Sequence, residues 1–279
     1  MLSKLKAIIV LLRPPDLLLA AIGCFIGALI ASDSVREYLK EIVFADLAAV
    51  LGSGAATSIN DYYDVDIDRI NRPHRPLVSG EVRRSEALLL TFTMVVLGLA
   101  LSYMINIFCF AVAVMSAILL FLYSFKFKRV ILLGNLTVAY LMSMAILFGG
   151  IAVENVGILI PLGIAAFLVG LSREIMKDIE DVRGDLERGI RTLPIVYGER
   201  GSRIFSAILL ILFIVVLFKS HSYLPFGREF LFFLGLLSLP LIYVLYLLLT
   251  NGRIFLISRI TKIVMFLILM LFLFERLIF

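Results

Sequence analysis

Long apolar runs separated by short polar segments make up most of this 279-residue chain. A helix that spans the hydrocarbon core of a bilayer needs about 20 mostly apolar residues. The apolar positions are continuous or follow a helical period, and they do not alternate over the roughly ten-residue segments typical of membrane β-barrels. The pattern therefore predicts nine membrane-spanning helices, at residues 16–32, 42–60, 87–104, 107–125, 130–150, 155–172, 204–219, 229–249 and 260–279.

The composition agrees with a protein that is embedded in a membrane. Hydrophobic residues make up 62% of the chain and charged residues 17%, whereas soluble domains carry roughly 25% charged residues. The sequence predicts an all-α membrane protein in which residues 1–279 form a single bundle, without a separate soluble domain. Residues 1–13 are expected to form an amphipathic helix at the membrane interface. They are not read as a signal peptide, because no small-residue cleavage site precedes Arg13-Pro14-Pro15.

Lysine and arginine are distributed unevenly over the segments that connect the predicted spans. Loops on the cytoplasmic side of a membrane carry an excess of these residues. With a cytoplasmic N-terminus, 21 of the 26 lysines and arginines fall on the cytoplasmic side. The distribution therefore predicts a multi-pass protein of the cell membrane with its N-terminus inside and its C-terminus outside. The net charge of +5 then belongs mainly to the cytoplasmic face.

Two polar segments carry aspartates at the same intervals. The first is NDYYDVDIDRINRPHRP at residues 60–76, and the second lies within SREIMKDIEDVRGDLERGIRTLPIVYGER at residues 172–200. Each aspartate of the second set follows its counterpart by 117 residues, and in both segments Arg-x-Leu and then a glycine come next. The aspartates are Asp61, Asp64 and Asp68 in the first segment and Asp178, Asp181 and Asp185 in the second.

Four predicted spans separate the two acidic segments, so both face the same side of the membrane on parallel helices. We interpret this pattern as an internal duplication of four helices, at residues 14–129 and 130–249, followed by a ninth helix at 260–279. Parallel repeats in membrane proteins are related by an axis along the membrane normal. Such an arrangement would bring the two acidic segments face to face across one cavity.

The spacing of the aspartates indicates a metal site. Residues three and four apart share one face of a helix, and carboxylates gathered on such a stripe need a compensating positive charge. Oxygen ligands without Cys or His select a hard cation, usually Mg²⁺ held by carboxylates and substrate phosphates. A single acidic run would more often be solvated surface charge, but the repeated spacing argues against that alternative. The predicted ligands are Asn60, Asp61, Asp64, Asp68, Asp178, Asp181 and Asp185.

Cationic side chains also gather at the predicted cytoplasmic ends of the spans. Arginine is well suited to bidentate contact with phosphate, although the general excess of positive charge on this side is an alternative explanation for each cation. Acidic and basic groups beside apolar helices together predict a substrate with a diphosphate head and a long hydrocarbon tail. The cations concerned are Arg72, Arg75, Lys126, Lys128, Arg129 and Arg191.

With these motifs the chain resembles the UbiA superfamily of intramembrane prenyltransferases, which has nine transmembrane helices and two aspartate-rich motifs. The first motif of that family, N-D-x-x-D-x-x-x-D, matches residues 60–68, and the second matches the aspartates of residues 178–185. The resemblance covers about residues 13–203 and rests on hydropathy alone in the last three helices. Within the family, the two acidic segments are most similar to those of the archaeal digeranylgeranylglyceryl phosphate synthases.

This resemblance implies a reaction. Two Mg²⁺ ions would hold the diphosphate of geranylgeranyl diphosphate, and the free hydroxyl of geranylgeranylglyceryl phosphate would attack C1, which forms the second ether bond of archaeal membrane lipids. The hydrocarbon tails would lie between helices that open to membrane lipid. An aspartate or the diphosphate itself would act as the base.

The resemblance also implies roles for individual residues. The catalytic residues would be Asp64, Asp68, Asp181 and Asp185. The residues that bind the diphosphate would be Arg72, Arg75, Lys126, Lys128 and Arg191. The candidates for contact with the acceptor are Arg13, Tyr123, Arg129, Asn135 and Ser143, with Lys126 and Lys128 as further candidates for its phosphate. Asp16 and Tyr140 are further polar groups inside predicted spans, and interhelical hydrogen bonds are the alternative explanation for such groups.

Three alternatives remain at this stage. An aromatic acceptor, such as a quinone or tetrapyrrole precursor, would leave the fold unchanged. A divalent-cation transporter would also carry paired aspartates, but transport sites usually lie near the middle of the bilayer. A CDP-alcohol phosphotransferase motif begins with Asp-Gly, a dipeptide that this sequence lacks.

Cysteine, histidine and basic patches do not suggest other chemistry. Cys24 and Cys109 lie in apolar runs and have neither metal-ligand spacing nor a disulfide pattern, so we expect them to be small packing residues. The two histidines, His74 and His221, are too few for a histidine-based metal site. No basic face outside the membrane predicts binding of nucleic acid, and no pattern predicts an oligomeric state.

Overall fold

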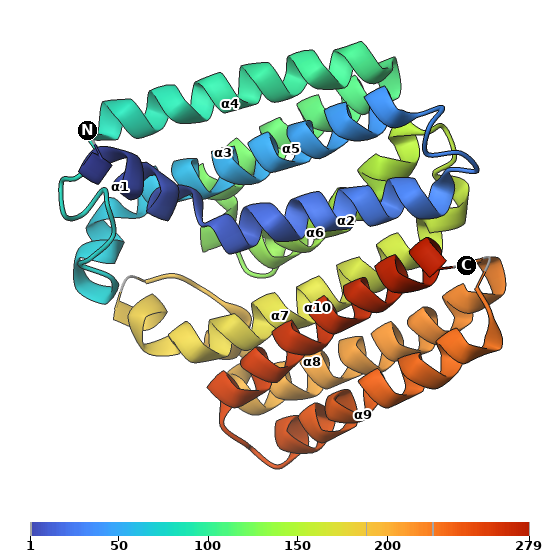
Figure 1. Cartoon of the computed structure of the whole chain (residues 1–279). Helices are drawn as coiled ribbons and strands as arrows, with labels where there is room; N and C mark the ends of the chain where they lie inside the picture. Colours follow the sequence, from blue (N-terminus) through green and yellow to red (C-terminus); the bar gives the residue numbers. More distant parts are fainter. Residues whose placement is uncertain (1, 188, 225, 279) are drawn as a thin grey trace.

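The computed structural model describes residues 2–187, 189–224 and 226–278. These residues form ten α-helices and three short 3₁₀ helices, without a β-strand (Figure 1). The α-helices are α1 (Leu2–Leu12), α2 (Pro14–Ala31), α3 (Leu39–Asn71), α4 (Arg84–Ile105), α5 (Ile107–Phe125), α6 (Leu133–Ala152), α7 (Ile160–Glu187), α8 (Leu193–Ser220), α9 (Arg228–Leu249) and α10 (Ile254–Ile278). The 3₁₀ helices are η1 (Phe127–Arg129), η2 (Gly157–Leu159) and η3 (His221–Tyr223).

The prediction of nine spanning helices is confirmed over the described part of the chain, where α2 to α10 are each long and apolar enough to cross a bilayer. Several helices are longer than the apolar runs predicted. Helix α3 continues to Asn71 and α7 to Glu187, so the aspartates of both acidic segments lie in helices. A helix can extend beyond the apolar layer because its backbone groups remain hydrogen-bonded within the helix itself.

The N-terminal residues form the expected helix, α1, which packs on the rest of the bundle. Ala7 and Leu11 of α1 are 2% and 1% exposed, and they join an apolar cluster that includes Val65 of α3 and Ala87 of α4. Lys4 forms an ion pair with Glu86 at the start of α4. Helix α1 thereby closes one end of the bundle beside the first acidic segment. Its placement at a membrane interface stays a prediction.

Helices α2 and α6 cross closely. A Cβ atom added at Gly149 of α6 would lie 2.1 Å from the carbonyl oxygen of Cys24, and one added at Gly27 of α2 would lie 2.0 Å from that of Ile146. Small residues at helix interfaces let membrane helices approach closely, and here they fix α2 against α6. Cys24 and Cys109 are both fully buried in the apolar cluster beside this crossing, as expected of packing residues.

Helices α7 to α10 form the other part of the bundle and carry much of the largest apolar cluster (Figure 1). Helix α7 packs on α8, and α9 packs on α10. The C-terminal end of α10 is joined to the end of α2, because Arg276 donates hydrogen bonds to the carbonyl oxygens of Leu29 at 2.9 Å and Ser32 at 2.8 Å. In Figure 1, α2 (blue) and α10 (red) approach each other near this contact and diverge toward their other ends.

The predicted duplication of four helices stays a prediction, although one local feature is consistent with it. The glycines that follow the two acidic segments, Gly80 and Gly198, have positive φ angles of 79° and 82°. Residues with a side chain rarely adopt such angles. Each glycine therefore allows the chain to turn into the helix that follows; at Gly198 this is a kink inside α8.

Candidate active site

The first acidic stripe occupies the last turns of α3. Asp61, Asp64 and Asp68 lie within this continuous helix, which ends where the backbone N–H of Arg72 donates to the carbonyl oxygen of Asp68 at 2.8 Å. Asp61 and Asp68 are 3% and 4% exposed. Asp66, which is not part of the stripe, has a side chain that is 75% exposed. The predicted spacing thus separates the buried aspartates from the solvated one.

Cations from three other segments converge on this stripe. Arg75, in the turn after α3, donates from Nη1 to Oδ1 of Asp61 at 2.8 Å and also forms an ion pair with Asp68. Arg13, between α1 and α2, forms an ion pair with Asp61, and Lys128 of η1 forms one with Asp64. All four carboxylate contacts involve side chains that are at most one-third exposed. The stripe is therefore neutralised by protein cations in the structure.

Local backbone structure explains how these cations reach the carboxylates. Arg13 adopts a left-handed conformation with φ of 52°, which separates α1 from α2. Beyond α3, the backbone N–H of Arg75 donates to the carbonyl oxygen of Arg72 at 3.0 Å in a tight turn. Lys128 is held near α6, because a Cβ atom at Gly134 would lie 2.9 Å from the Cα of Lys128.

The second acidic stripe occupies the last turns of α7. Asn135 of α6 donates from Nδ2 to Oδ2 of Asp178 at 2.8 Å. Asp185 is half-buried and Asp181 is exposed. One turn before Asp178, the buried Glu174 lies 3.8 Å from the guanidinium of Arg173 and 3.6 Å from the ammonium of Lys177. Glu174 extends the stripe toward the interior of the bundle, and the sequence reasoning missed it.

Tyr123 of α5 lines the same cavity as Asn60 of α3 and Glu174 of α7. Tyr123 is also one of the predicted contacts of the acceptor. Both acidic segments therefore contribute to the cavity, the first through Asn60 and the second through Glu174 and its neighbours on α7.

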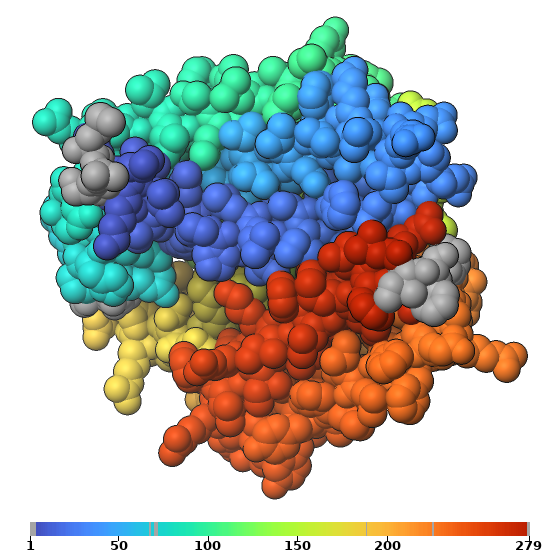
Figure 2. All heavy atoms as spheres, in the orientation of Figure 1, coloured from blue at the N-terminus to red at the C-terminus, as the bar shows by residue number. Residues whose placement is uncertain are grey.

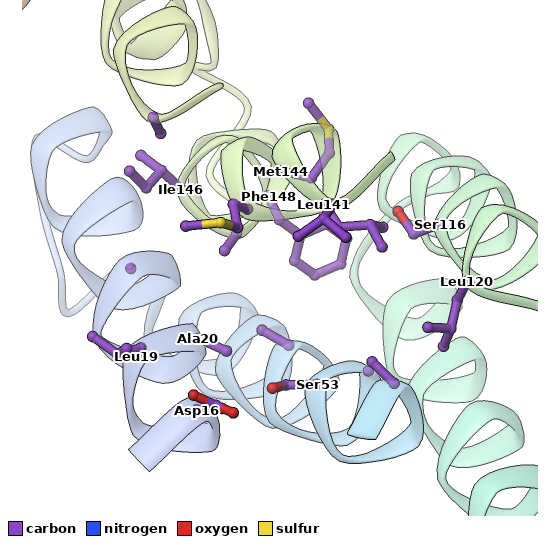
Figure 3. Close-up of a pocket in the computed structure, with 18 of the residues that line it drawn as sticks. Asp16, Leu19, Ala20, Ser53, Ser116, Leu120, Leu141, Met144, Ile146 and Phe148 are labelled. Atoms are coloured by element: carbon purple, nitrogen blue, oxygen red, sulfur yellow. The ribbon is translucent and has the colours of Figure 1, made fainter. Parts of the chain in front are cut away.

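That cavity has a volume of about 520 Å³ and extends from the acidic end into the apolar interior. Pockets for small organic ligands usually measure roughly 300–1,000 Å³. Its polar end includes Arg13, Asn60 and Tyr123, all three predicted site residues. Figure 3 shows Asp16 of α2 and Ser53 of α3 on one side, and Leu141 and Phe148 of α6 on the other. The cavity thus combines a polar end with a long apolar wall.

Four charged residues line this cavity without having been predicted: Arg173, Glu174, Lys177 and Lys262. The signal for Glu174 was its place four residues before Asp178, which continues the same helical stripe. Lys262 gives no comparable signal, because it follows Arg253 and Arg259 and reads as part of the general positive charge before the apolar run of α10. Its place in the cavity depends on packing between helices far apart in sequence.

Most predicted site residues do not line the cavity, and among these are the six aspartates of the stripes, Arg75 and Lys128. Arg72, Lys126, Arg129 and Arg191 are exposed, and none of them lines it. Ser143 is buried, and its hydroxyl donates to the carbonyl oxygen of Tyr140 at 2.8 Å. Asn135 is engaged by Asp178 rather than directed into the cavity. The predicted roles of these residues in binding stay predictions, and the cavity gives them no support.

The side chains of the two stripes supply the oxygen ligands that a hard divalent cation prefers. They do not stand in a preformed metal-binding arrangement. Among the described residues, no three His, Cys, Asp or Glu side chains stand in an arrangement that could hold a metal ion. All the donors are oxygens, as Mg²⁺ prefers. Asn60 lines the cavity, and its Oδ1 atom is buried without a hydrogen-bond partner. Such an orphaned acceptor normally has a partner, which a bound cation would supply.

The chain is similar in sequence to several archaeal enzymes. The digeranylgeranylglyceryl phosphate synthase of Thermococcus kodakarensis is 38% identical over 215 residues, or 77% of each chain. That of Methanococcus maripaludis is 40% identical over 213 residues, or 76% of each chain. The profile of the UbiA prenyltransferase family matches residues 20–273.

Solved structures agree with this relationship. A structure described as giving insights into digeranylgeranylglyceryl phosphate synthase in membranes has a TM-score of 0.80 and 33% sequence identity, with 98% of each chain covered. A UbiA homologue from Archaeoglobus fulgidus bound to GPP and Mg²⁺ has a TM-score of 0.70 and 20% identity, with 98% of this chain and 100% of that chain covered. The second likeness establishes the fold alone. The chain belongs to the UbiA prenyltransferase family, and it is a multi-pass membrane enzyme that transfers prenyl groups.

Proposed function

We propose that the protein transfers a geranylgeranyl group from geranylgeranyl diphosphate to the free hydroxyl of geranylgeranylglyceryl phosphate, in a reaction that depends on Mg²⁺. The observation that carries this proposal is the cavity itself, in which a polar end lined by Asn60 of α3 and by Glu174 and Lys177 of α7 continues into an apolar wall. A prenyl diphosphate has this same division between a charged head and a hydrocarbon tail. The archaeal relatives, which carry the name of this activity, support the choice of substrates.

Binding of the donor would rearrange the ion pairs at the polar end. Asn60, Asp64 and Asp68 on α3 would hold one Mg²⁺, and Asp178, Asp181 and Asp185 on α7 would hold a second. Bound Mg²⁺ would neutralise the diphosphate and act as a Lewis acid and a template. Arg75 and Lys128 now contact Asp68 and Asp64, and they would then be available to phosphate oxygens. Arginine and lysine are both common phosphate ligands in proteins.

Asp61 has a different role in this proposal from the one its position in the motif suggests. It is 3% exposed, and it is paired with both Arg13 and Arg75. Its neighbour Asn60 lines the cavity with an Oδ1 atom that has no hydrogen-bond partner, whereas none of the six stripe aspartates lines it. We therefore assign Asp61 to the positioning of the two arginines, and Asn60 to the metal.

The chemical step follows from this arrangement. The bond between C1 and the diphosphate oxygen breaks, and its electron pair leaves with the diphosphate. The hydroxyl oxygen of the acceptor forms the new bond to C1 of the allylic cation, and its proton passes to an aspartate or to the departing diphosphate. Positively charged side chains and preorganised dipoles stabilise the charge that develops on the leaving group. The apolar wall formed by residues such as Leu141 and Phe148 limits access of water to the cation.

A panel of acceptors tests this proposal. Purified protein would be incubated with labelled geranylgeranyl diphosphate, Mg²⁺ and either geranylgeranylglyceryl phosphate or 4-hydroxybenzoate. The proposal predicts a labelled diether lipid with the first acceptor and no product with the second. Transfer to 4-hydroxybenzoate alone would overturn the proposed acceptor and leave the family assignment intact. Hydrolysis of the donor without transfer to either acceptor would also contradict the proposal.

The orientation of the enzyme is part of this proposal. With the N-terminus in the cytoplasm, the two acidic stripes would face the cytoplasm. The charged head of the diphosphate donor would then be bound on that side of the membrane. The excess of lysine and arginine on that side supports this orientation.

A further inference from the structure

The positively charged residues that line the cavity differ in how well they are neutralised. Arg13 is paired with the buried Asp61. The carboxylate of Glu174 lies 3.8 Å from the guanidinium of Arg173 and 3.6 Å from the ammonium of Lys177, and it is the one carboxylate of α7 that lines the cavity with them. Within the described part of the chain, Lys262 forms neither a hydrogen bond nor an ion pair, although it lines the same cavity. The wall formed by α7 and α10 therefore carries more positive than negative charge.

The position of Lys262 is costly unless it serves a purpose. It lies eight residues after the first residue of α10, or roughly 12 Å along the helix, within a membrane-spanning segment. Ionisable residues inside such segments are rare and usually mark a functional path. Met265, Phe266 and Leu269 follow it on the same face of α10 and also line the cavity. Lys262 is thus a cation at the edge of an apolar surface.

A lysine near the end of a spanning helix often extends toward the interface simply to reach water. Arg259, one turn earlier on α10, is exposed and does not line the cavity, so it matches this simpler explanation. Lys262 is exposed as well, but unlike Arg259 it lines the cavity. The comparison of these two residues separates a ligand-binding role from a general preference for positive charge.

Of the cations expected from the sequence to bind the acceptor, Arg13 lines the cavity but is paired with Asp61, and the others do not line it. Lys128 is paired with Asp64 of the first stripe, where it belongs with the donor. Lys126 and Arg129 are exposed and do not line the cavity. A second anionic group in the cavity would therefore meet the cations of α7 and α10.

The gap between α2 and α10 can hold the apolar tail of a lipid whose anionic head lies in the cavity. The two helices are joined at one end by the hydrogen bonds of Arg276. Farther from that contact, Leu19 and Ala20 of α2 and Met265 and Phe266 of α10 line the cavity. Figure 2 shows the blue surface of α2 and the red surface of α10 separating on the side away from this contact. A lipid tail can occupy this apolar gap while its head lies at Lys262.

We propose that Lys262 of α10, together with Arg173 and Lys177 of α7, binds the phosphate of a glycerol-phosphate lipid acceptor. This inference rests on the proposed function, because it assigns the acceptor of that reaction to a particular wall of the cavity. The donor diphosphate is bound by the acidic stripes and their cations, and the acceptor phosphate is bound separately by α7 and α10. Lys262 is a specificity residue in this account, since it selects acceptors that carry a phosphate.

The test compares two acceptors that differ by the phosphate alone, geranylgeranylglyceryl phosphate and geranylgeranylglycerol. A hydrogen bond to a charged group is typically strong enough to change affinity about 10- to 100-fold. We expect Lys262→Ala to raise the KM for the phosphorylated acceptor by about 10-fold or more. The kcat/KM for geranylgeranylglycerol and the KM for geranylgeranyl diphosphate should change less than about twofold. Lys262→Arg should restore most of the preference for the phosphate.

Arg259→Ala is the matched control, because Arg259 is an exposed cation of the same helix that does not line the cavity. It should leave the preference for the phosphorylated acceptor at the wild-type value. An equal loss with both acceptors in Lys262→Ala, or a loss with the donor alone, would overturn the inference while the wild-type enzyme still makes the diether product. If the wild-type enzyme does not use geranylgeranylglyceryl phosphate, the proposed function fails, and the inference fails with it.

Discussion

Arg75 donates a hydrogen bond from Nη1 to Oδ1 of Asp61 at 2.8 Å, and the same nitrogen pairs with Asp68. Both carboxylates are almost completely buried. Removal of one partner from a buried ion pair leaves an uncompensated charge, which typically costs about 3–5 kcal/mol. Arg75 therefore stabilises the end of α3 before any substrate is bound.

We expect Arg75→Ala to lower the free energy of unfolding by about 3 kcal/mol, because Arg13 still compensates Asp61. The thermal unfolding midpoint of the protein in detergent would measure this loss. Arg69→Ala is the control, since Arg69 is 68% exposed and reaches only the solvated Asp66, at 3.5 Å. Equal midpoints for the two variants would contradict the structural role assigned to Arg75.

Asp64 belongs to the first acidic stripe, whereas Asp66, two residues later, is solvated. Substitutions of these two neighbouring aspartates should therefore have different effects. Asp64→Ala and Asp181→Ala should each abolish prenyl transfer, because each removes an oxygen ligand of the proposed metal sites. Asp66→Ala should retain activity within about twofold of the wild type, because the Asp66 side chain is 75% exposed and lies outside the stripe. Turnover would be measured with labelled donor, and gel filtration in detergent would establish that each variant is folded. An active Asp64→Ala variant would contradict the role of the stripe.

An added methyl group should have opposite effects on stability at Gly149, which lies in the crossing of α2 and α6, and at Gly235, which lies in open space. A Cβ atom at Gly149 would lie 2.1 Å from the carbonyl oxygen of Cys24 and 2.5 Å from the backbone nitrogen of Ala28. Overpacking of this kind costs about 1–3 kcal/mol or more. A Cβ atom at Gly235 of α9 would have no neighbour within 4 Å, and Ala favours helices over Gly by roughly 1 kcal/mol.

Gly149→Ala should therefore lower the thermal unfolding midpoint, and Gly235→Ala should leave it unchanged or raise it. Since Gly149 lies beside the cavity-lining Phe148, the first variant should also lose activity. A Gly149→Ala variant as stable as the wild type would show that α2 and α6 do not cross as closely as described.

The proposed orientation can be tested by labelling from each side of the membrane. The native thiols of Cys24 and Cys109 are fully buried, so they would be replaced or would remain silent. A cysteine at the exposed Arg83, just before α4, should react with an impermeant maleimide from the cytoplasmic side. A cysteine at the exposed Lys40, near the start of α3, should react from the outside. Labelling of both positions from one side would contradict the orientation.

Much of this architecture is predictable from the sequence, because membrane insertion imposes a strong local signal. Hydropathy predicts the nine spans, and the intervals of three and four residues predict the stripes that α3 and α7 present. The ends of helices are harder to predict: α3 and α7 continue past their apolar runs through segments in which charged residues could equally have formed loops. The paired aspartates alone were compatible with both an enzyme and a divalent-cation transporter. The family assignment favours the enzyme.

Contacts between distant helices could not be predicted in the same way. Lys128 was expected near phosphate, and the structure pairs it with Asp64, 64 residues earlier. Lys262 was not predicted at all, because its importance arises from the packing of α10 beside the cavity. Both positions depend on tertiary structure rather than on any local pattern.

The central claim is that two acidic stripes and an apolar cavity together transfer a prenyl group to a phosphorylated lipid. The most direct measurement is the formation of labelled diether lipid from labelled geranylgeranyl diphosphate and geranylgeranylglyceryl phosphate, with Mg²⁺, with EDTA, and with Mg²⁺ restored in excess over EDTA. The account predicts product with Mg²⁺, none with EDTA, and recovery when Mg²⁺ is restored. Full activity in EDTA, or no diether product with Mg²⁺, would contradict it.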